Sequence, residues 1–406
     1  MSEHNVVVVG AGLGGAQVVQ TLREEGFSGD VTLVGAEPEL PYDRPKLSKE
    51  YLQGKLGRDE ICLHRRDWYE QQGVRLIIGE RVDSIDRTGH TVLLASGETL
   101  PYGHLVLATG AESRHLHMPG EDLPGVRTLR ELAESDALRE EFARGGRLAV
   151  IGAGWIGLEV AAAARMAGMD VTVVAPVPQP LSNILGERIG AYFADLHRRN
   201  GVDVRMEVGV ESVLELDGRA NGIRTDHGDI EANLVLLAVG AAPRLDLARA
   251  AGLEVDNGVL VDEKLRTADP AILAIGDIAN AQNTLLGQRL RREHWDNALR
   301  QGALAARTIM GRGGTYDWLP YFFTDQFDLG MEYVGNNSPD DETLVRGSMD
   351  SGEFIVFWHR DGMVTASMNV NVWDVNDTLR EIVGHPVEAE RLADTSVELT
   401  DLVPKA

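Results

Sequence analysis

Two stretches of the chain share one pattern: VVVVGAGLGGAQVVQ at Val6–Gln20 and LAVIGAGWIGLEVAA at Leu148–Ala162. In each, a short apolar run typical of a buried strand leads into Gly-x-Gly-x-x-Gly and then into a helix of small and apolar residues. The first glycine of such a loop makes a tight turn, the second lets the backbone approach a pyrophosphate, and the third lets the helix pack closely. The start of the helix offers unpaired N–H groups to the phosphates. The sequence therefore predicts two dinucleotide-binding loops, on Gly10, Gly12 and Gly15 and on Gly152, Gly154 and Gly157.

Each loop opens a predicted β–α–β unit, and each unit ends in a further apolar strand closed by glycine. In the first unit we expect strands at Val6–Val9, Val31–Val34 and Leu105–Ala108, with a helix at Ala16–Glu25. In the second we expect strands at Arg147–Ile151 and Val171–Val174, a helix at Ile156–Ala167, and a last strand that closes at Gly240. A repeat on this scale predicts an α/β protein with two Rossmann-like domains, like those of glutathione reductase.

Two other segments help to divide the chain. The Pro- and Gly-rich stretch His117–Val126 predicts a hinge or linker. After about Gly313, alternating aromatic and β-branched stretches with Gly and Asp-Gly turns predict an antiparallel sheet and hence a C-terminal α+β domain. A chain of 406 residues has room for two or three domains.

Composition narrows the class of protein and its partners. With 39 basic against 63 acidic residues, the net charge of −24 disfavours nucleic acid as a partner. A single cysteine, Cys62, allows neither an internal disulfide nor a thiolate metal site, so we expect no metal. We see no signal peptide, and the longest apolar run, from Leu234, is about half the length of a membrane span. These features predict a cytoplasmic protein without membrane contact.

Two loops imply two dinucleotides, which we interpret as a retained flavin and an exchangeable nicotinamide cofactor between which hydride passes. The residues alone do not say which loop holds which cofactor. Glu37, after the second strand, is a candidate acceptor for ribose hydroxyls. The corresponding position of the second unit is Ala175, with neither an acid nor an arginine adjacent, so the usual signal for NADH or NADPH is missing.

Three further candidates each have a purely structural alternative. The basic segment Arg44–Lys49, RPKLSK, suits a pyrophosphate or a flavin edge, or is a solvated loop. Glu159, expected in the first turn of its helix, could approach a nicotinamide or simply be stabilised by the helix dipole. Asp277, in AIGDIAN, could accept hydrogen bonds from a flavin's ribityl chain or cap the next segment.

Taken in order, the stretches VGAGLGG, LPYDRPKLSKEYL, LVLATG, VIGAGWIGLEVA, LAIGDIAN and FFTDQFDLGMEYVG resemble one family over nearly the whole chain. It is the family of NAD(P)H-dependent ferredoxin reductases that serve bacterial oxygenases, of the putidaredoxin reductase and biphenyl dioxygenase reductase type. These belong to the FAD-dependent pyridine nucleotide oxidoreductase superfamily. The resemblance implies that the first loop and Asp277 hold FAD and that the second loop holds NAD(H). It also implies that Lys49 and Glu159 form an ion pair near the flavin N5 and the nicotinamide.

The resemblance extends the site to neighbouring positions. It implies FAD contacts at Leu13, Gly14, Glu37, Arg44, Val82, Ala108, Thr109, Gly110, Arg130, Gly276 and Trp295, and nicotinamide-cofactor contacts at Trp155, Ile156 and Gly240. Taken alone, Trp295 reads as a core aromatic, and only the resemblance makes it a flavin contact. The implied domains are 1–116 and 244–314 for FAD, 117–243 for NAD(P), and 315–406 at the C-terminus.

Two positions depart from the family pattern. Phe323 replaces a tryptophan that members often carry near the flavin, which puts in doubt an electron route through that ring. Ala175 replaces the glutamate found in many members, which weakens NADH over NADPH as the predicted cofactor. Arg289, Arg291 and Arg292, with Arg65 and Arg66, are a candidate patch for an acidic protein partner or a solvated loop.

The predicted function is therefore an FAD-dependent NAD(P)H:ferredoxin oxidoreductase. It would pass electrons from NADH, with NADPH left open, to an iron–sulfur ferredoxin that supplies a mono- or dioxygenase. One alternative is direct reduction of small acceptors such as quinones or monodehydroascorbate, and another is a redox sensor like apoptosis-inducing factor. A disulfide or peroxide reductase would need a redox cysteine at the flavin, and Cys62 is single and lies beyond the RPKLSK loop.

Overall fold

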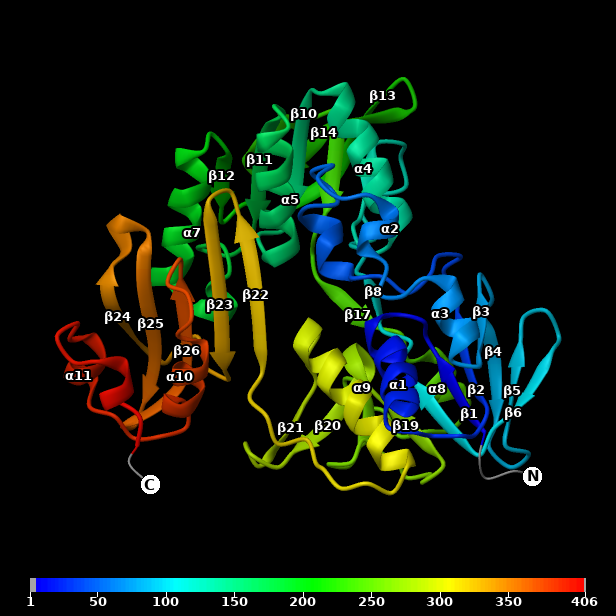
Figure 1. Ribbon diagram of the computed structural model, residues 1–406. Coiled ribbons are helices and arrows are strands. Elements are labelled where there is room, and N and C mark those ends of the chain that lie inside the picture. Colours follow the sequence, from blue (N-terminus) through cyan, green and yellow to red (C-terminus); the bar gives the residue numbers. More distant parts are fainter. Residues whose placement is uncertain (1–4, 405–406) are drawn as a thin grey trace. The chain divides into compact units, whose positions relative to one another are not determined.

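The computed structural model describes residues 5–404, and the chain divides into two compact units (Figure 1). The first unit comprises the chain up to Pro45, Leu56–Glu112 and Ala241–Pro320. The second comprises Lys46–Lys55, Ser113–Gly240 and the chain from Tyr321 onward. Each unit contains one of the two glycine-rich loops.

A fully parallel five-stranded sheet, in the order β19-β7-β1-β2-β3, is the centre of the first unit. Its inner strands β1, β2 and β7 consist mostly of buried valine and leucine, as is usual for parallel strands that helices cover on both faces, whereas only Val74 is buried in the edge strand β3. The elements of this unit are β1 (Val6–Val9), α1 (Leu13–Glu24), β2 (Val31–Gly35), α2 (Arg58–Ile61), α3 (Arg66–Gln71), β3 (Val74–Ile78), β4 (Val82–Asp86), β5 (Thr91–Leu94), β6 (Thr99–Pro101), β7 (His104–Leu107), β8 (Ala111–Ser113, at the boundary), β17 (Ala241–Pro243), α8 (Asp246–Ala250), β18 (Val259–Val261), β19 (Ile272–Ala274), β20 (Ala279–Asn283), β21 (Gln288–Leu290) and α9 (Trp295–Ile309).

Helices α1 and α9 lie against each other in this unit (Figure 1). Glycine makes the close approach possible, since a Cβ on Gly302 of α9 would lie 2.7 Å from the carbonyl oxygen of Gly14 in α1. The same contact places the start of α9 beside the turn after β19. A hydrogen bond of 2.7 Å from the Gly276 N–H to the Gln301 side chain fixes that turn.

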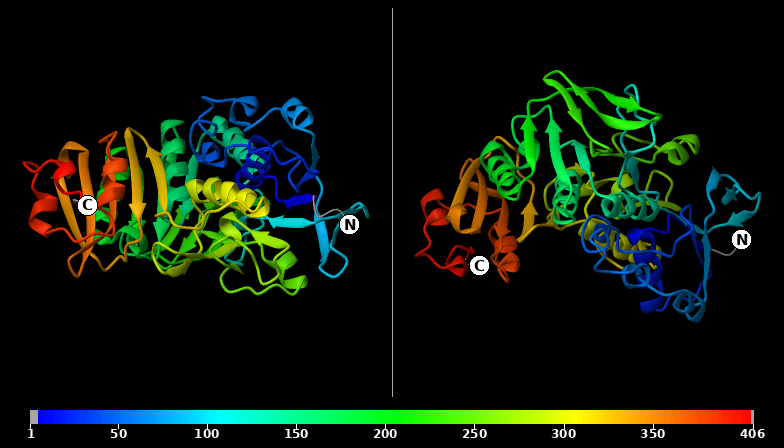
Figure 2. Two further views of the ribbon diagram at one scale, coloured as in Figure 1. Left: turned by 60° about the horizontal axis from the view of Figure 1, so that its bottom comes forward. Right: turned by 90° about the horizontal axis from the view of Figure 1, so that it is seen from above.

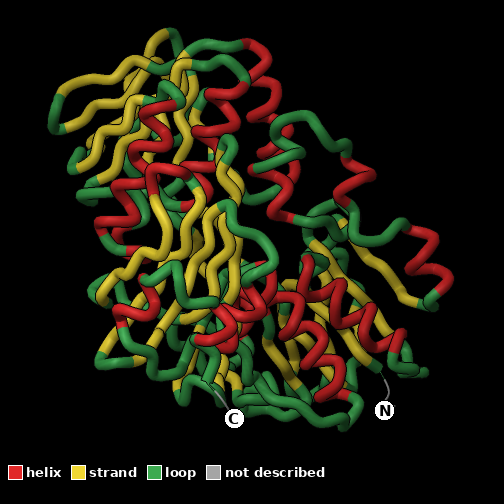
Figure 3. The backbone as a smooth tube through the Cα atoms, turned by 60° about the vertical axis from the view of Figure 1, so that its left-hand side comes forward, coloured by secondary structure: helices red, strands yellow, loops and turns green. Residues whose placement is uncertain are grey.

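A second parallel sheet, in the order β12-β11-β10-β16-β9, repeats this plan in the second unit. Figure 3 colours the helices of the described chain red and its strands yellow. The elements up to Gly240 are β9 (Val126–Arg127), α4 (Leu132–Arg144), β10 (Arg147–Ile151), α5 (Trp155–Met166), β11 (Asp170–Ala175), α6 (Ser182–Leu185), α7 (Glu187–Arg199), β12 (Asp203–Met206), β13 (Val210–Leu216), β14 (Arg219–Thr225), β15 (Gly228–Glu231) and β16 (Leu234–Leu237).

The C-terminal part of the second unit is an antiparallel sheet in the order β22-β23-β26-β25-β24. Figure 2 shows these strands, yellow to orange, beside the green helix α7, and the two share one core around Phe193 and Trp358. The elements are β22 (Tyr321–Gln326), β23 (Leu329–Gly335), β24 (Glu342–Ser348), β25 (Glu353–Arg360), β26 (Met363–Val370), α10 (Asn376–Ile382) and α11 (Ala389–Ala393).

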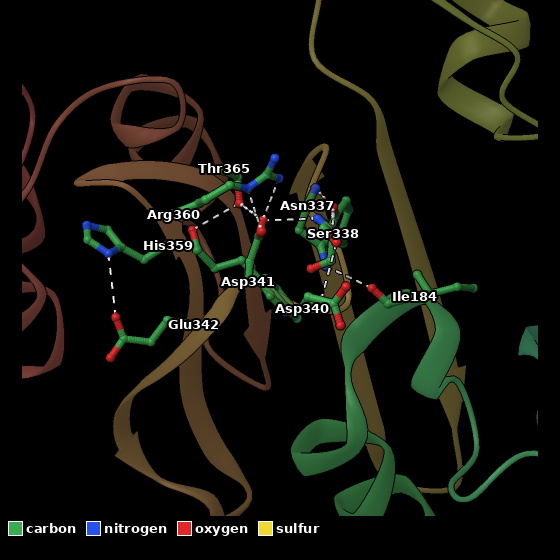
Figure 4. Close-up of polar contacts among 11 residues, drawn as sticks. Ile184, Asn337, Ser338, Asp340, Asp341, Glu342, His359, Arg360 and Thr365 are labelled. Carbon is green, nitrogen blue, oxygen red and sulfur yellow. Dashed lines mark hydrogen bonds and ion pairs between the residues drawn. The ribbon is translucent and has the colours of Figure 1, made fainter.

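Polar contacts fix the turn between β23 and β24, as Figure 4 shows. The carboxylate of Asp341 accepts hydrogen bonds from Arg360 and Thr365 and from the Ser338 N–H. Burial alone would raise the pKa of Asp341, but these donors lower it, so the residue is ionised at neutral pH. From the same turn, the Asn337 side chain donates to the carbonyl of Ile184 in α6, which ties the antiparallel sheet to the rest of the second unit.

The predicted fold class is confirmed: two parallel α/β sheets with glycine-rich loops and a C-terminal antiparallel sheet. The main difference lies in where helices begin. α1 starts at Leu13 rather than Ala16, because Gly14 and Gly15 lie inside its first turn, where the helix packs closely on its surroundings. The four predicted domain segments stay a prediction. Among residues 5–404, no helix is both long and apolar enough to cross a membrane.

Candidate functional site

The first glycine-rich loop joins β1 to α1, and its three glycines meet different surroundings. Gly10 has a φ of +117°, and a Cβ there would lie 2.1 Å from the Ala108 carbonyl oxygen. A Cβ on Gly15 would lie 2.0 Å from the Gly10 carbonyl oxygen. Around Gly12, by contrast, no atom of the described chain lies within 4 Å of such a Cβ. Two glycines are required by the protein itself, and the third opens onto space that a ligand can fill.

The second loop, between β10 and α5, has the same geometry. Gly152 has a φ of +111°, and its Cβ would lie 2.3 Å from the Ala238 carbonyl oxygen. A Cβ on Gly157 would lie 2.3 Å from the Gly152 carbonyl oxygen, whereas one on Gly154 meets no described atom within 4 Å. The loop is therefore a close structural copy of the first, and both fit the approach of a pyrophosphate to backbone N–H groups.

Neither helix start is closed by a side chain. Gly12 and Gly154 are the N-cap residues of α1 and α5, and neither helix has an acidic residue in its first turn. The unpaired N–H groups and the positive end of the helix dipole are thus left for an anionic ligand. The expectation that Glu159 lies in the first turn is wrong, because α5 begins at Trp155 and Glu159 is its fifth residue.

Several of the predicted flavin contacts gather in the first unit. The Glu37 carboxylate accepts hydrogen bonds of 2.6 Å from the Tyr42 hydroxyl and 2.8 Å from Arg44. Burial acts to lower the pKa of Arg44, but its interactions with Tyr42, Glu37 and Asp277 raise it, so two carboxylates and a phenol surround this guanidinium. Glu37, Arg44 and Asp277 therefore form one electrostatic cluster.

Trp295, the first residue of α9, donates from its indole Nε1 to the Asp43 carboxylate at 2.8 Å. This bond sets the orientation of the ring. It also ties Trp295 of α9 to the segment that carries Arg44. Trp295 is therefore neither a plain core aromatic nor an isolated surface ring. Asp43 gave no signal in the sequence beyond lying next to Arg44.

The remaining predicted residues of the first unit lie on loops and strand ends. Ala108 directly follows β7, and the Thr109 hydroxyl donates to the Arg244 carbonyl at 3.0 Å. Gly110 and Gly276 both have a positive φ, which explains glycine at these turns. Leu13 and Gly14 are the first two residues of α1, and Val82 begins β4.

The second unit contains a buried ion pair between Lys49 and Glu159. The Lys49 ammonium lies 2.5 Å from Oε1 of Glu159, and the two residues are only 5% and 4% exposed. The resemblance implied this pair, which joins the RPKLSK segment to α5. A buried charge without a partner is very costly, so each residue stabilises the other in this buried position.

Two hydroxyls complete the environment of Glu159. Ser48 donates to Oε2 at 2.5 Å, and Thr324 of β22 donates to Oε1 at 2.6 Å. Glu159 thus accepts three hydrogen bonds from two separate segments, Ser48–Lys49 and β22. Within the described chain the Lys49 ammonium donates one hydrogen bond, which leaves two of its N–H groups for a ligand. Its charge also lies 5.4 Å from the centre of the Phe323 ring, in cation–π contact.

Asp325, next to Thr324 on β22, senses the same charges. Burial raises the pKa of Asp325, Glu159 raises it further, and Lys49 opposes the shift. Two carboxylates and one ammonium are therefore coupled here, which makes the surroundings of Lys49 sensitive to any change in charge.

The other predicted residues of the second unit lie in the first turn of α5, at the turn after β16 and before α4. Trp155 and Ile156 begin α5, and the Trp155 ring packs on Phe193 and Phe322. Gly240 has a φ of +99° and lies beside Arg114. Arg130 lies just before α4, where its N–H donates to Glu134. Among residues 5–404, no group of three or more His, Cys, Asp or Glu side chains is placed to hold a metal ion.

Sequence reasoning missed several residues of this site: Tyr42, Asp43, Ser48 and Thr324. The first three lie inside or beside the quoted LPYDRPKLSK stretch and carry polar side chains next to a candidate, which is the one signal that could have found them. Thr324 lies in the quoted FFTDQFDLGMEYVG stretch, where strand alternation puts Thr324 on the face opposite Phe323.

Of the candidate basic patch, Arg289 and Arg291 are already engaged. Arg289 donates to the carbonyls of Val261 and Asn280, and Arg291 pairs with Glu293 at 2.6 Å. These contacts favour a structural role for this part of the patch.

His294, directly before Trp295, provides a test of stability against pH. Burial, aided by the charge of Arg292, lowers the pKa of His294 from 6.5 to about 3. Between these two values the unfolded chain binds the proton and the folded chain does not, so the free energy of unfolding falls as the pH drops below about 6.5. We expect His294→Gln to flatten the decline of the melting temperature between pH 6.5 and pH 4, measured with excess FAD. An unchanged slope would contradict this placement of His294.

The comparisons with known proteins agree with this geometry. Residues 4–302 match the family described as pyridine nucleotide-disulphide oxidoreductase, and residues 321–403 match the reductase C-terminal family. The chain belongs to the pyridine nucleotide-disulphide oxidoreductase family. Membership confirms the superfamily that the glycine loops and the ordered motifs predicted, and the second match accounts for the antiparallel sheet.

Full-length relatives place the protein more narrowly. The chain is 39% identical to rhodocoxin reductase of Rhodococcus erythropolis, over 97% of this chain and 93% of that one. It is 39% identical to the ferredoxin–NAD(+) reductase component of the anthranilate 1,2-dioxygenase system of Burkholderia cepacia, over 98% and 99%. It is also similar to the crystal structure of a covalent putidaredoxin reductase–putidaredoxin complex, with 35% identity, 98% of each chain covered and a TM-score of 0.94. The predicted resemblance to oxygenase-associated ferredoxin reductases is confirmed.

Proposed function

We propose that this pyridine nucleotide oxidoreductase is an FAD-dependent NADH:ferredoxin reductase that supplies electrons to an oxygenase. The observation that carries the proposal is the pair of matching loops in which Gly12 and Gly154 open onto empty space while their neighbours are tightly packed. One chain with two such loops is suited to hold a donor and an acceptor dinucleotide at once.

The first unit would hold FAD. The Gly10–Gly15 loop and the start of α1 would bind its pyrophosphate, Glu37 would accept from ribose hydroxyls, and Asp277 would accept from the ribityl chain. The second loop and the start of α5 would bind the nicotinamide cofactor in the same way. Bound flavin supplies the conversion between two-electron hydride chemistry and one-electron transfer, and the protein supplies position and charge.

Lys49 and Glu159 would then act at the redox centre. The two remaining N–H groups of Lys49 can donate to a ligand that gains negative charge, while Glu159 holds the ammonium in a fixed direction. A preorganised, buried positive charge stabilises such a ligand far more than the charge of a solvated lysine would. Neither residue needs to be a nucleophile or a proton-transfer base.

The choice of NADH over NADPH rests on the name of one relative, because the chain lacks the usual residue signal. β11 ends at Ala175, so the carboxylate that usually binds the 2′-hydroxyl of NADH is absent at this position. One of the relatives named above is an NAD(+) reductase, and this favours NADH. NADPH stays the alternative, and the cytoplasmic location expected from the sequence stays a prediction.

The ferredoxin partner is proposed from the relatives. One is named as a rhodocoxin reductase, one as a dioxygenase-system reductase, and one was crystallised with putidaredoxin. An iron–sulfur ferredoxin is the partner class that these names share with the sequence-based resemblance. The downstream enzyme, a mono- or a dioxygenase, is not specified by the chain.

A disulfide or peroxide reductase is disfavoured by the state of Cys62. Burial, together with Asp59 and Glu39, raises the pKa of this thiol, whose S–H points to the Arg58 carbonyl. A redox-active cysteine needs the opposite shift, toward the thiolate. The remaining alternatives are direct reduction of small acceptors and slow redox sensing.

The deciding test is an NADH-driven reduction of cytochrome c by the FAD-loaded protein, with and without an added iron–sulfur ferredoxin. A carrier-coupled reductase should show at least a tenfold higher rate with the ferredoxin. Equal rates with and without it, together with rapid turnover of quinones, would point to the direct reductase. A flavin that NADH reduces but that no acceptor reoxidises quickly would point to the sensor.

A further inference from the structure

A chain of hydrogen-bonded, buried polar side chains connects Glu159 of α5 to helix α7 in the second unit. Thr324 donates to Glu159 at 2.6 Å, Gln326 contacts Thr324 at 3.2 Å, and His197 of α7 contacts Gln326 at 2.9 Å. His197 and Gln326 are at most 1% exposed, as is Thr324. These three residues, His197, Gln326 and Thr324, are called the relay below.

The chemistry of each group fixes the direction of every hydrogen bond. The Gln326 carbonyl oxygen can only accept, so the Nε2 of His197 carries the proton and donates it. The Gln326 amide nitrogen can only donate, so Thr324 accepts from it. The single hydroxyl proton of Thr324 is then directed to Oε1 of Glu159. All donors point the same way, toward the carboxylate.

A neutral His197 is required for this arrangement, and its surroundings provide it. Burial lowers the pKa of His197, and the ring packs edge-on against Phe327. Among residues 5–404, Nδ1 has no hydrogen-bond partner, which agrees with an unprotonated nitrogen there. A row of aligned donors polarises its members, so the last bond, to the anion, gains most.

We infer that the relay fixes the Glu159 carboxylate in place, and that Thr324, Gln326 and His197 are therefore positioning residues for the Lys49–Glu159 pair. None of them needs to touch a cofactor. The inference rests on the proposed function, because Glu159 has a redox role only there. It explains why three polar side chains are buried together in a core of aromatic and aliphatic residues.

The test compares three proteins that differ at one position. Thr324→Val keeps the methyl group and the shape but removes the hydroxyl, whereas Thr324→Ser keeps the hydroxyl and removes the methyl. We expect stopped-flow reduction of the bound flavin by NADH to be about tenfold slower in Thr324→Val, with Thr324→Ser within about threefold of wild type. Thr225→Val is the matched control, since Thr225 is a buried threonine of the same unit whose hydroxyl donates to the Gly228 carbonyl.

A second readout does not depend on activity. In protein labelled with 15N-histidine, the His197 ring signals, assigned by their loss in His197→Asn, should report the Nε2–H tautomer and should shift in Thr324→Val but not in Thr225→Val. The Nδ1–H tautomer, or a Thr324→Val rate equal to wild type, would overturn the relay. So would Thr324→Ser being slower than Thr324→Val, which would indicate packing. A wild-type flavin that NADH does not reduce would refute the proposed function instead, and the tautomer would still decide on the relay.

Discussion

Lys49→Met is expected to slow flavin reduction by NADH by about 10²–10³-fold, the usual effect of removing one prearranged donor from a redox or catalytic centre. Methionine keeps the length and apolar stem of lysine and removes only the ammonium. That ammonium lies 2.5 Å from Glu159 and over the Phe323 ring. Neither of these neighbours carries a positive charge that could replace it. The measurement is a stopped-flow trace of the flavin absorbance after mixing with NADH.

The same substitution should destabilise the second unit. Without Lys49, Glu159 keeps only its neutral donors Ser48 and Thr324, and a buried charge that has lost its partner costs about 3–5 kcal/mol of unfolding free energy. Denaturant unfolding of the apoprotein measures this loss.

A double variant separates the two effects. Replacing both members, in Lys49→Met with Glu159→Leu, removes the unpaired charge and should recover most of the stability, since buried ion pairs are often replaced by apolar groups at little cost. The rate of flavin reduction should stay low. A double variant that recovered both stability and rate would show that the pair serves folding alone.

The glycine loops show why so much of the fold was predictable. A strand followed by Gly-x-Gly-x-x-Gly permits few backbone paths, since the close approaches at Gly10 and Gly15 exclude any side chain. The parallel sheets followed from the apolar runs that flank these loops. The start of α1 was predicted three residues late, at Ala16, although Gly14 and Gly15 enter the helix where close packing requires them.

The site was less predictable, because its centre joins segments that are distant in the chain. Ser48, Glu159 and Thr324 come from three separate stretches, and no local pattern relates them. Lys49 and Glu159 were paired only through the family resemblance. Thr324 lies in the quoted motif but was not singled out beside Phe323. A buried threonine does not change the alternating pattern by which a strand is predicted, so its hydroxyl gives no separate signal.

The assignment of the two loops can be tested with a pair of substitutions that should leave the fold intact. Gly12 and Gly154 both have extended backbone, with φ of −83° and −85°, that alanine adopts without strain. Neither Cβ would meet a described atom within 4 Å. Gly313→Ala is the matched control, because Gly313 also faces open space but lies outside both loops.

We expect each of the two variants to lose a different cofactor. Gly12→Ala should weaken FAD binding by more than about tenfold, so that the protein is purified largely colourless, because the added methyl takes the place of the pyrophosphate. Gly154→Ala should stay yellow and be reduced normally by dithionite, while its apparent affinity for NADH falls by a similar factor. All three variants should melt within about 2 °C of wild-type apoprotein, since surface substitutions that touch nothing rarely change stability by more than about 0.5 kcal/mol.

If Gly12→Ala kept its flavin and lost NADH, the loops would have the opposite assignment. If neither variant differed from Gly313→Ala, the open space above these glycines would not be where the cofactors bind, and the two-dinucleotide function would have to be abandoned.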